Sequence, residues 1–248
     1  METQIVVTPS LPTFFTVFLC FYLFAYFVVF RNWGPKHQAE ASSCLLSLAH
    51  GTPAVLLAIY GLIHTQSPPT FASPNTTSQN IALEFSTAYF ILDLLHYLVF
   101  FPSDILFILH HLATLYVITT CLYVVRHGAY AILVLLVLAE VTSCCQNVWS
   151  LSSFRKTDVP MAAKLHEFLT PRFYAFYSVF RGILGPLFVF KMGVFYASGE
   201  ADALIPKWAW ISWTVVIGSA ILVSISWILN HWIDWHRERS YKSQKKVR

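Results

Sequence analysis

Two adjacent histidines, His110 and His111, stand in one apolar stretch of the chain, and Asp93 and His96 stand three residues apart in the stretch before it. A neutral imidazole can act as a base, a nucleophile or a hydrogen-bond donor near pH 7. The histidine pair therefore predicts a functional site. Asp93 and His96 would share one face of a helix, where they form either part of that site or a local structural pair.

Other ionisable side chains also interrupt apolar stretches, and such groups cost about 3 kcal/mol or more inside a membrane, so each is a candidate functional residue. The full set is His50, Glu84, Asp93, His96, His110, His111, Glu140 and Arg181. Two more of them have structural alternatives. A lone histidine such as His50 is more often a hydrogen-bonded packing residue, and Arg181 would be a guanidinium that reaches the headgroups or pairs with Asp93 or Glu140.

The elements that must position these residues are membrane-spanning helices. Of the 248 residues, 56% are hydrophobic and 11% are charged, with a mean hydropathy of +0.59. Soluble chains carry roughly 25% charged residues. A span needs about 20 mostly apolar residues, and the stretches that qualify are 11–30, 43–63, 81–101, 105–125, 129–149, 173–196 and 208–230.

We therefore predict an all-α membrane protein, a multi-pass bundle of about seven spans, with six as the alternative. The apolar runs lack the alternation of barrel strands, which leaves helices. The least regular span is 43–63, which we expect to be a broken, partly polar helix buried among the others. Gly182, Gly185 and Pro186 predict a further break in the sixth span.

The basic residues predict the orientation, because cytosolic loops are enriched in Lys and Arg. A lumenal N-terminus and seven spans place twelve of the sixteen basic residues on the cytosolic side. These twelve are Arg31, Lys36, Arg155, Lys156, Lys164, Arg172, Arg237, Arg239, Lys242, Lys245, Lys246 and Arg248. The C-terminus is then cytosolic, and we expect the first span to be retained rather than cleaved as a signal.

Two short motifs bear on location. Lys245 and Lys246 occupy the third and fourth positions from the C-terminus, which resembles a dilysine signal read by the coat-type retrieval machinery of the endoplasmic reticulum. The alternative is a basic tail that rests on anionic lipid. Asn75 opens an Asn-Thr-Thr sequon in a loop that this topology makes lumenal, so it is a possible N-glycosylation site.

The ionisable groups fall at one depth. Counting 1.5 Å per residue from the expected span ends places His50, Asp93, His96, His110, His111, Glu140 and Arg181 about 8–13 Å below the cytosolic face. Glu140, Cys144 and Asn147 would share one helical stripe, and His110 and Thr114 another. We expect these stripes to face the bundle interior. The five cysteines read as buried apolar residues, and the chain contains no motif for a metal, a nucleotide or nucleic acid.

Residues 109–114 (LHHLAT) resemble the His-His-x-x-Thr signature of the TLC-domain family, which includes ceramide synthases and translocating-chain-associated membrane proteins. Residues 93–96, 126–128 and 140–143 resemble flanking elements of the same family. The resemblance covers roughly residues 40–240. It implies a domain organisation of an anchor and basic loop (1–40), a helical bundle (41–235) and a basic cytosolic tail (236–248).

The resemblance further implies an endoplasmic-reticulum membrane protein concerned with lipids. By analogy with the ceramide synthases, His110 and His111 would be the catalytic pair with Asp93 in support. His50, His96, Thr114, Glu140, Asn147 and Arg181 would then contact the ligand. The synthases carry a His-Asp-x-x-Asp element where this chain has only Glu140, so it is more similar to the small members of the family.

Three functions follow as hypotheses. The first is binding or sensing of a membrane lipid or acyl-CoA in lipid homeostasis, without ceramide synthesis. The family resemblance links either kind of role to sphingolipid and ceramide metabolism. The second is acyl-CoA-dependent transfer to a sphingoid base or another acceptor, which needs no cofactor beyond the acyl-CoA substrate. The third is lipid or solute transport, for which the inverted repeats common in transporters are not detected. No nucleic-acid partner is expected.

Overall fold

The computed structural model describes residues 10–65 and 69–247, with the side chains of all but Lys36 and residues 241–247. Within these residues, seven helical segments are long and apolar enough to cross a membrane. The α-helices are α1 (Leu11–Phe24), α2 (Pro35–Ile63), α3 (Thr77–Phe100), α4 (Ile105–Thr119), α5 (Ala129–Glu140), α6 (Ser143–Arg155), α7 (Pro160–Tyr177), α8 (Gly185–Ala197) and α9 (Lys207–Val247). Three π-helical segments extend or join them: η1 (Ala25–Val29), η2 (Thr120–Val125) and η3 (Ser178–Leu184).

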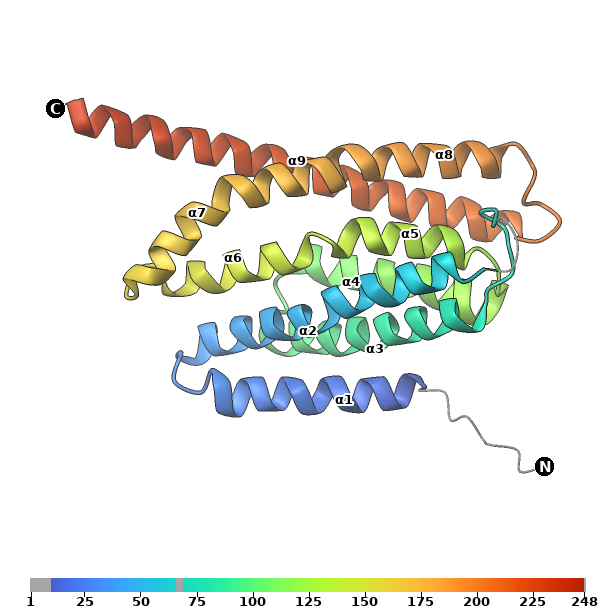
Figure 1. The fold of residues 1–248 in the computed structure, drawn as a ribbon, viewed down its shortest axis with the longest axis horizontal. Helices are drawn as coiled ribbons and strands as arrows, with labels where there is room; N and C mark the ends of the chain where they lie inside the picture. The colour runs from blue at the N-terminus through green and yellow to red at the C-terminus, as the bar shows by residue number, and fades with distance from the viewer. Residues whose placement is uncertain (1–9, 66–68, 248) are drawn as a thin grey trace.

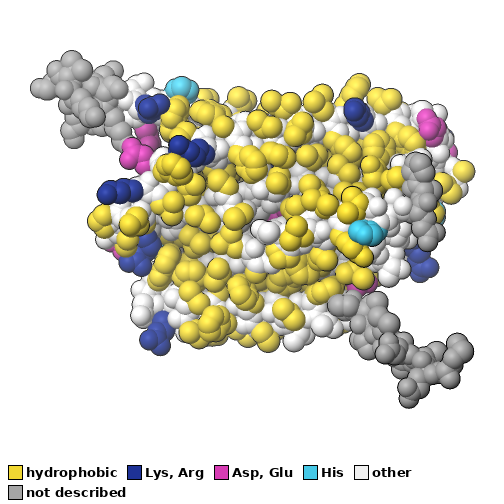
Figure 2. Space-filling view, in the orientation of Figure 1, with side chains coloured by type: hydrophobic (Ala, Val, Ile, Leu, Met, Phe, Trp, Pro, Cys, Tyr) yellow, Lys and Arg dark blue, Asp and Glu magenta, His cyan; other side chains and the backbone are white. Residues whose placement is uncertain are grey.

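The helices form a bundle in which successive segments run in opposite directions (Figure 1). The chain enters at one end with α1 and leaves at the other with α9, as an odd number of spans requires. Hydrophobic side chains cover the middle of the visible face, and Lys and Arg gather mostly at the end where α9 leaves the bundle (Figure 2). Large apolar side chains are outward-facing, with Val99, Phe190 and Leu222 all more than 60% exposed. These features confirm a multi-pass helical membrane protein.

Helix α2 is central to the bundle, because it packs against α3, α5 and α6. It is an unbroken helix of 29 residues with Pro53 in its interior, so the prediction of a broken helix over 43–63 was wrong. Neighbouring helices can compensate for the backbone donor that a proline lacks. The prediction that this segment is buried among other helices is confirmed, since Leu46, His50, Ala54 and Ala58 are fully buried.

The interruption lies instead in the fifth span, where α5 ends at Glu140 and α6 begins at Ser143. The prediction of one helical stripe through Glu140, Cys144 and Asn147 was therefore wrong. Cys144 is exposed, and Asn147 Nδ2 donates to the backbone and side-chain oxygens of Ser143 at 2.9 and 3.1 Å. Two turn residues, Val141 and Thr142, interrupt the helix between Glu140 and the other two positions.

The sixth span is continuously helical from Pro160 to Ala197, so the prediction of a break at Gly182, Gly185 and Pro186 was wrong. The helix instead contains the π segment η3, which includes Gly182 and ends just before Gly185. These glycines let α9 approach closely. A Cβ on Gly182 would lie 3.1 Å from Ile228 Cδ1, and one on Gly185 would lie 3.0 Å from Ile221 Cδ1. Small residues at helix contacts are the usual means of close packing within membranes.

The sequon residue Asn75 fastens the loop before α3 to the turn before α5. Its Nδ2 donates to the Cys121 carbonyl at 3.0 Å, and its Oδ1 accepts from the Ala129 amide at 2.9 Å. In that turn Arg126 has a φ of 61° and Gly128 a φ of 90°. Glycine adopts such positive φ angles without strain. A glycan on Nδ2 would replace one of the two amide hydrogens and would have to fit beside this contact. The side chains of Lys245 and Lys246 lie outside the described part of the chain.

Candidate functional site

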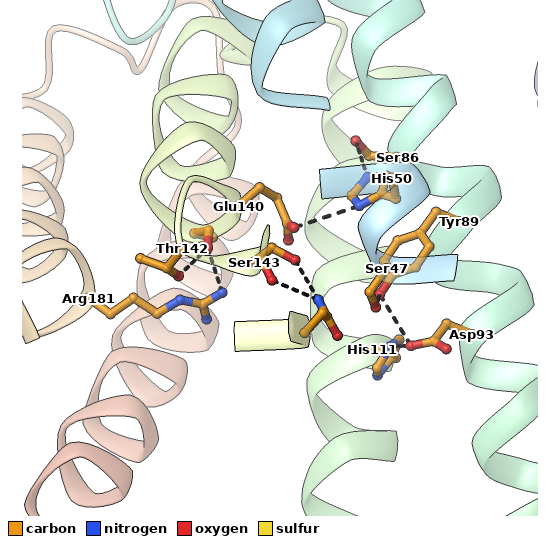
Figure 3. Close-up of polar contacts among 12 residues, drawn as sticks. Ser47, His50, Ser86, Tyr89, Asp93, His111, Glu140, Thr142, Ser143 and Arg181 are labelled. Atoms are coloured by element: carbon orange, nitrogen blue, oxygen red, sulfur yellow. Dashed lines mark hydrogen bonds and ion pairs between the residues drawn. The ribbon is translucent and has the colours of Figure 1, made fainter. Parts of the chain in front are cut away.

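His111 is a buried residue that bonds through both ring nitrogens, and Figure 3 shows it beside Asp93. Its Nδ1 lies 2.7 Å from the Phe107 carbonyl, and its Nε2 lies 2.9 Å from Asp93 Oδ2. Because a carbonyl oxygen only accepts, Nδ1 carries a hydrogen. The bond at Nε2 is then made either by an imidazolium to a carboxylate or by a protonated Asp93 to a neutral ring. In both states the pair is electrically neutral overall.

Asp93, on α3, is 2% exposed and accepts from two further side chains. Ser43 on α2 donates to Oδ1 at 2.7 Å, and Tyr89 on α3 donates to Oδ2 at 3.3 Å. The Tyr89 hydroxyl in turn lies 2.6 Å from Ser47 Oγ. Three donors on three helices thus meet at one carboxylate. This network ties α2, α3 and α4 together and leaves little of Asp93 for a ligand.

His50 lies one layer further along α2 and is fully buried. Its ring stacks on Tyr89 with centroids 3.9 Å apart and planes 6° apart, and its Nε2 lies 3.1 Å from Ser86 Oγ. Its Nδ1 has no hydrogen-bond partner among the described residues and lies 3.7 Å from Glu140 Oε2. His50 therefore connects the buried network to Glu140 by proximity and not by a hydrogen bond.

The break between α5 and α6 exposes a helix end within the bundle. The Ala139 carbonyl accepts from Arg181 Nη2 at 2.8 Å and from Thr142 Oγ1 at 3.2 Å. A cation at the carboxyl end of a helix also complements the helix dipole. Gly51 permits α2 to approach this break, because a Cβ there would lie 2.9 Å from Ser143 Cβ and 3.3 Å from Glu140 Oε2.

On the other side of α4 and α5 lies a hollow of about 150 Å³, bounded by α4, α5, η3, α8 and α9. Its wall is mostly apolar, with residues such as Leu135, Val216 and Ile221. The charged and ionisable side chains on this wall are His110, Glu140 and Arg181. Such a lining, apolar with a few convergent polar groups, is typical of small-molecule sites.

The structure brings together some of the predicted site residues and separates others. His110 and Thr114 face the hollow with Glu140 and Arg181, as expected. His111, Asp93 and His50 lie behind it in the buried network. The two adjacent histidines therefore do not act on one ligand face. His110 is exposed, and its ring makes none of the hydrogen bonds found among the described residues.

Besides His50, two further predicted ligand contacts lie away from the hollow. His96 Nδ1 lies within hydrogen-bond distance, 2.7 Å, of the Tyr22 hydroxyl of α1, and this bond anchors the first span. Asn147 bonds within α6. Thr114 lines the hollow, but its hydroxyl donates to the His110 carbonyl at 2.9 Å within its own helix.

Sequence reasoning missed the hydroxyl groups of the network, Ser43, Ser47, Ser86 and Tyr89. A signal for them existed. Ser43 and Ser47 precede His50 at positions i, i+4 and i+7, which is a polar stripe on an apolar helix. Single hydroxyls in spans are common, however, so the stripe identifies a buried face only once its partners on α3 are known.

Comparison with known proteins places these features in a family. The family description "TLC domain" matches residues 40–232. A protein of Arabidopsis thaliana, named as TLC domain-containing, is 56% identical over 245 residues, which cover 97% of this chain and 96% of the relative. No solved structure matches the chain. The match spans the bundle, the network and the hollow, and the chain belongs to the TLC-domain family.

Proposed function

We propose that this protein binds a membrane lipid or acyl-CoA in the hollow and acts in membrane lipid homeostasis. The observation that carries the proposal is the hollow itself. An apolar wall suits an acyl chain, and the ionisable groups on that wall suit a polar head. A buried apolar lining with few polar groups is the form that lipid and cofactor sites take.

The test is photo-crosslinking of the purified protein in nanodiscs with a lipid and an acyl-CoA that carry a photoreactive acyl chain. Ala220→Trp fills the hollow from α9, because Ala220 lines it. Ser219→Trp is the matched control, since Ser219 is the preceding, exposed residue of the same helix. We expect labelling of residues around the hollow to be lost in Ala220→Trp and retained in Ser219→Trp. Equal labelling of both variants and the wild type would refute the proposal, provided that both variants elute as monodisperse protein.

A second candidate function, acyl transfer from acyl-CoA, is favoured by the free imidazole of His110. In this reaction His110 takes a proton from an amine or hydroxyl acceptor, which attacks the thioester carbonyl. The C–S bond then breaks, and the proton leaves with the thiol of coenzyme A. The Asp93–His111 pair would position α4 for this step and would not touch the substrate.

Radiolabelled long-chain acyl-CoA with sphingoid bases and other lipid acceptors tests this second candidate. The expected result is a labelled acyl product with wild-type protein and none with His110→Ala. His64→Ala serves as the control, because His64 is exposed at the end of α2. Absence of product from folded wild-type protein, beside an active ceramide synthase, would remove acyl transfer and leave lipid binding.

We further infer an endoplasmic-reticulum membrane location with a lumenal N-terminus and a cytosolic C-terminus. Support comes from the basic side chains at the end where α9 leaves the bundle and from the lysine pair in the tail (Figure 2). We expect Lys245→Ser/Lys246→Ser to move the protein to later secretory compartments by loss of contact with the retrieval coat. Tags at the two termini, stained after selective permeabilisation of the plasma membrane, test the orientation. An accessible N-terminal tag would contradict it.

A further inference from the structure

Two opposite charges line the hollow without pairing with each other. Glu140 and Arg181 both lie on its wall, yet they are farther apart than the 4.0 Å limit of an ion pair. Charges in a low-dielectric interior are costly when they are left unpaired. A ligand that pairs with both groups would offset this cost.

Glu140 has unused capacity to accept hydrogen bonds. Its side chain is 10% exposed, and its nearest ionisable neighbour is His50 Nδ1, at 3.7 Å. The Ser143 hydroxyl lies beside it and accepts from Asn147 at 3.1 Å. Among the described residues, no positively charged side chain reaches this carboxylate within ion-pair distance. A carboxylate offers about four acceptor positions, so most of those on Glu140 remain open.

Arg181 is held apart from Glu140 by the helix end that it caps. Its Nη2 donates to the Ala139 carbonyl at 2.8 Å, and its guanidinium lies 5.1 Å from the centre of the Tyr177 ring. Its Nε is buried and has no partner among the described residues. The guanidinium thus keeps a donor available while its position is fixed by α5.

A ligand that fits both groups must bring a donor with positive charge to Glu140 and an anionic oxygen to Arg181. An anionic head alone would leave Glu140 unpaired and would be repelled by it. A quaternary ammonium carries positive charge but no N–H to donate. A head with a protonated amine and an anionic oxygen a few atoms apart satisfies both groups and adds no net charge to the hollow.

We propose that the hollow selects amphiphiles whose head carries such an amine beside an anionic oxygen. Ethanolamine phospholipids carry this pair with no net charge, and serine phospholipids carry it together with one further carboxylate. This inference rests on the proposed lipid-binding function and names the class of lipid.

The experiment uses the full-length protein in detergent with photoreactive phosphatidylethanolamine as the probe. Unlabelled phosphatidylethanolamine, phosphatidylserine, phosphatidylcholine and phosphatidylglycerol compete for the site. We expect the two amine-bearing lipids to compete at concentrations about tenfold or more below those of the other two. A factor of about ten in affinity is what one hydrogen bond to a charged group contributes. Glu140→Gln keeps the shape but removes the charge, so the preference should fall to within about threefold. Glu84→Gln, a carboxylate of α3 that does not line the hollow, should keep the wild-type preference.

The outcomes separate the two proposals. Equal competition by all four lipids, with labelling still blocked by Ala220→Trp, would overturn the headgroup inference and leave lipid binding intact. Tighter competition by phosphatidylglycerol, or an unchanged preference in Glu140→Gln, would also overturn it. Absence of any labelling that depends on the hollow would overturn both.

Discussion

Asp93→Ala is expected to destabilise the protein strongly, because one carboxylate accepts from Ser43, Tyr89 and His111 on three helices. Polar bonds between membrane helices average about 0.6 kcal/mol each, so the loss of three bonds accounts for about 2 kcal/mol. The substitution also leaves the His111 ring buried without its counter-charge, and breaking a buried pair costs about 3–5 kcal/mol in total. We take about 3 kcal/mol as the expected loss.

Thermal unfolding of the purified protein in detergent, followed by tryptophan fluorescence, measures this loss. For a chain of this size, about 3 kcal/mol corresponds to a fall in Tm of about 6–12 °C. The matched control is Asp158→Ala, which breaks a surface pair with Arg155 at 2.7 Å where the Asp158 side chain is 53% exposed. We expect the control to change Tm by less than about 2 °C. If Asp93→Ala unfolds at the same temperature as Asp158→Ala, the network does not hold the three helices together and the reasoning fails.

Three further predictions use the same assay. Gly51→Ala should lower the free energy of unfolding by about 1–3 kcal/mol, because the added Cβ overpacks α2 on the α5–α6 break. Gly218→Ala should be neutral or slightly stabilising, because a Cβ there meets nothing within 4 Å. Equal effects of the two substitutions would contradict the close approach at Gly51. Tyr22→Phe should cost about 1 kcal/mol through the lost bond to His96, and a full loss of folding would show that α1 depends on more than packing. Asn75→Ala should cost about 2 kcal/mol, and glycosidase treatment should leave the mobility of the wild type unchanged, since its amide nitrogen is engaged by the Cys121 carbonyl.

The spans were predictable from the sequence because a membrane demands about 20 apolar residues for each crossing. The interruptions of the helices were not. The break at Val141 and Thr142 contains neither glycine nor proline, whereas Pro53 lies inside an unbroken helix. Helix continuity within a bundle depends on which neighbours satisfy the freed backbone groups, and this information lies in distant parts of the chain.

The gathering of ionisable groups was predictable, but their division into a buried network and a hollow was only partly so. Consecutive residues of an α-helix point about 100° apart, so His110 and His111 were bound to face different neighbours. The sequence does not say which of the two meets Asp93. That choice depends on how α4 is rotated about its axis relative to α3. In the structure this rotation brings His111, and not His110, to Asp93.

The π segment η3 sets the rotational phase of the sixth span. A π turn, closed by i→i+5 bonds, takes up about one residue more than an α turn, and such turns are frequent at functional sites. Arg181 stands inside this segment, between α7 and α8. A one-residue deletion within η3 would restore a regular helix, and the side chain of Arg181 would turn by up to about 100° away from the Ala139 carbonyl. The length of this short segment, more than the identity of its residues, therefore controls whether a guanidinium reaches the hollow.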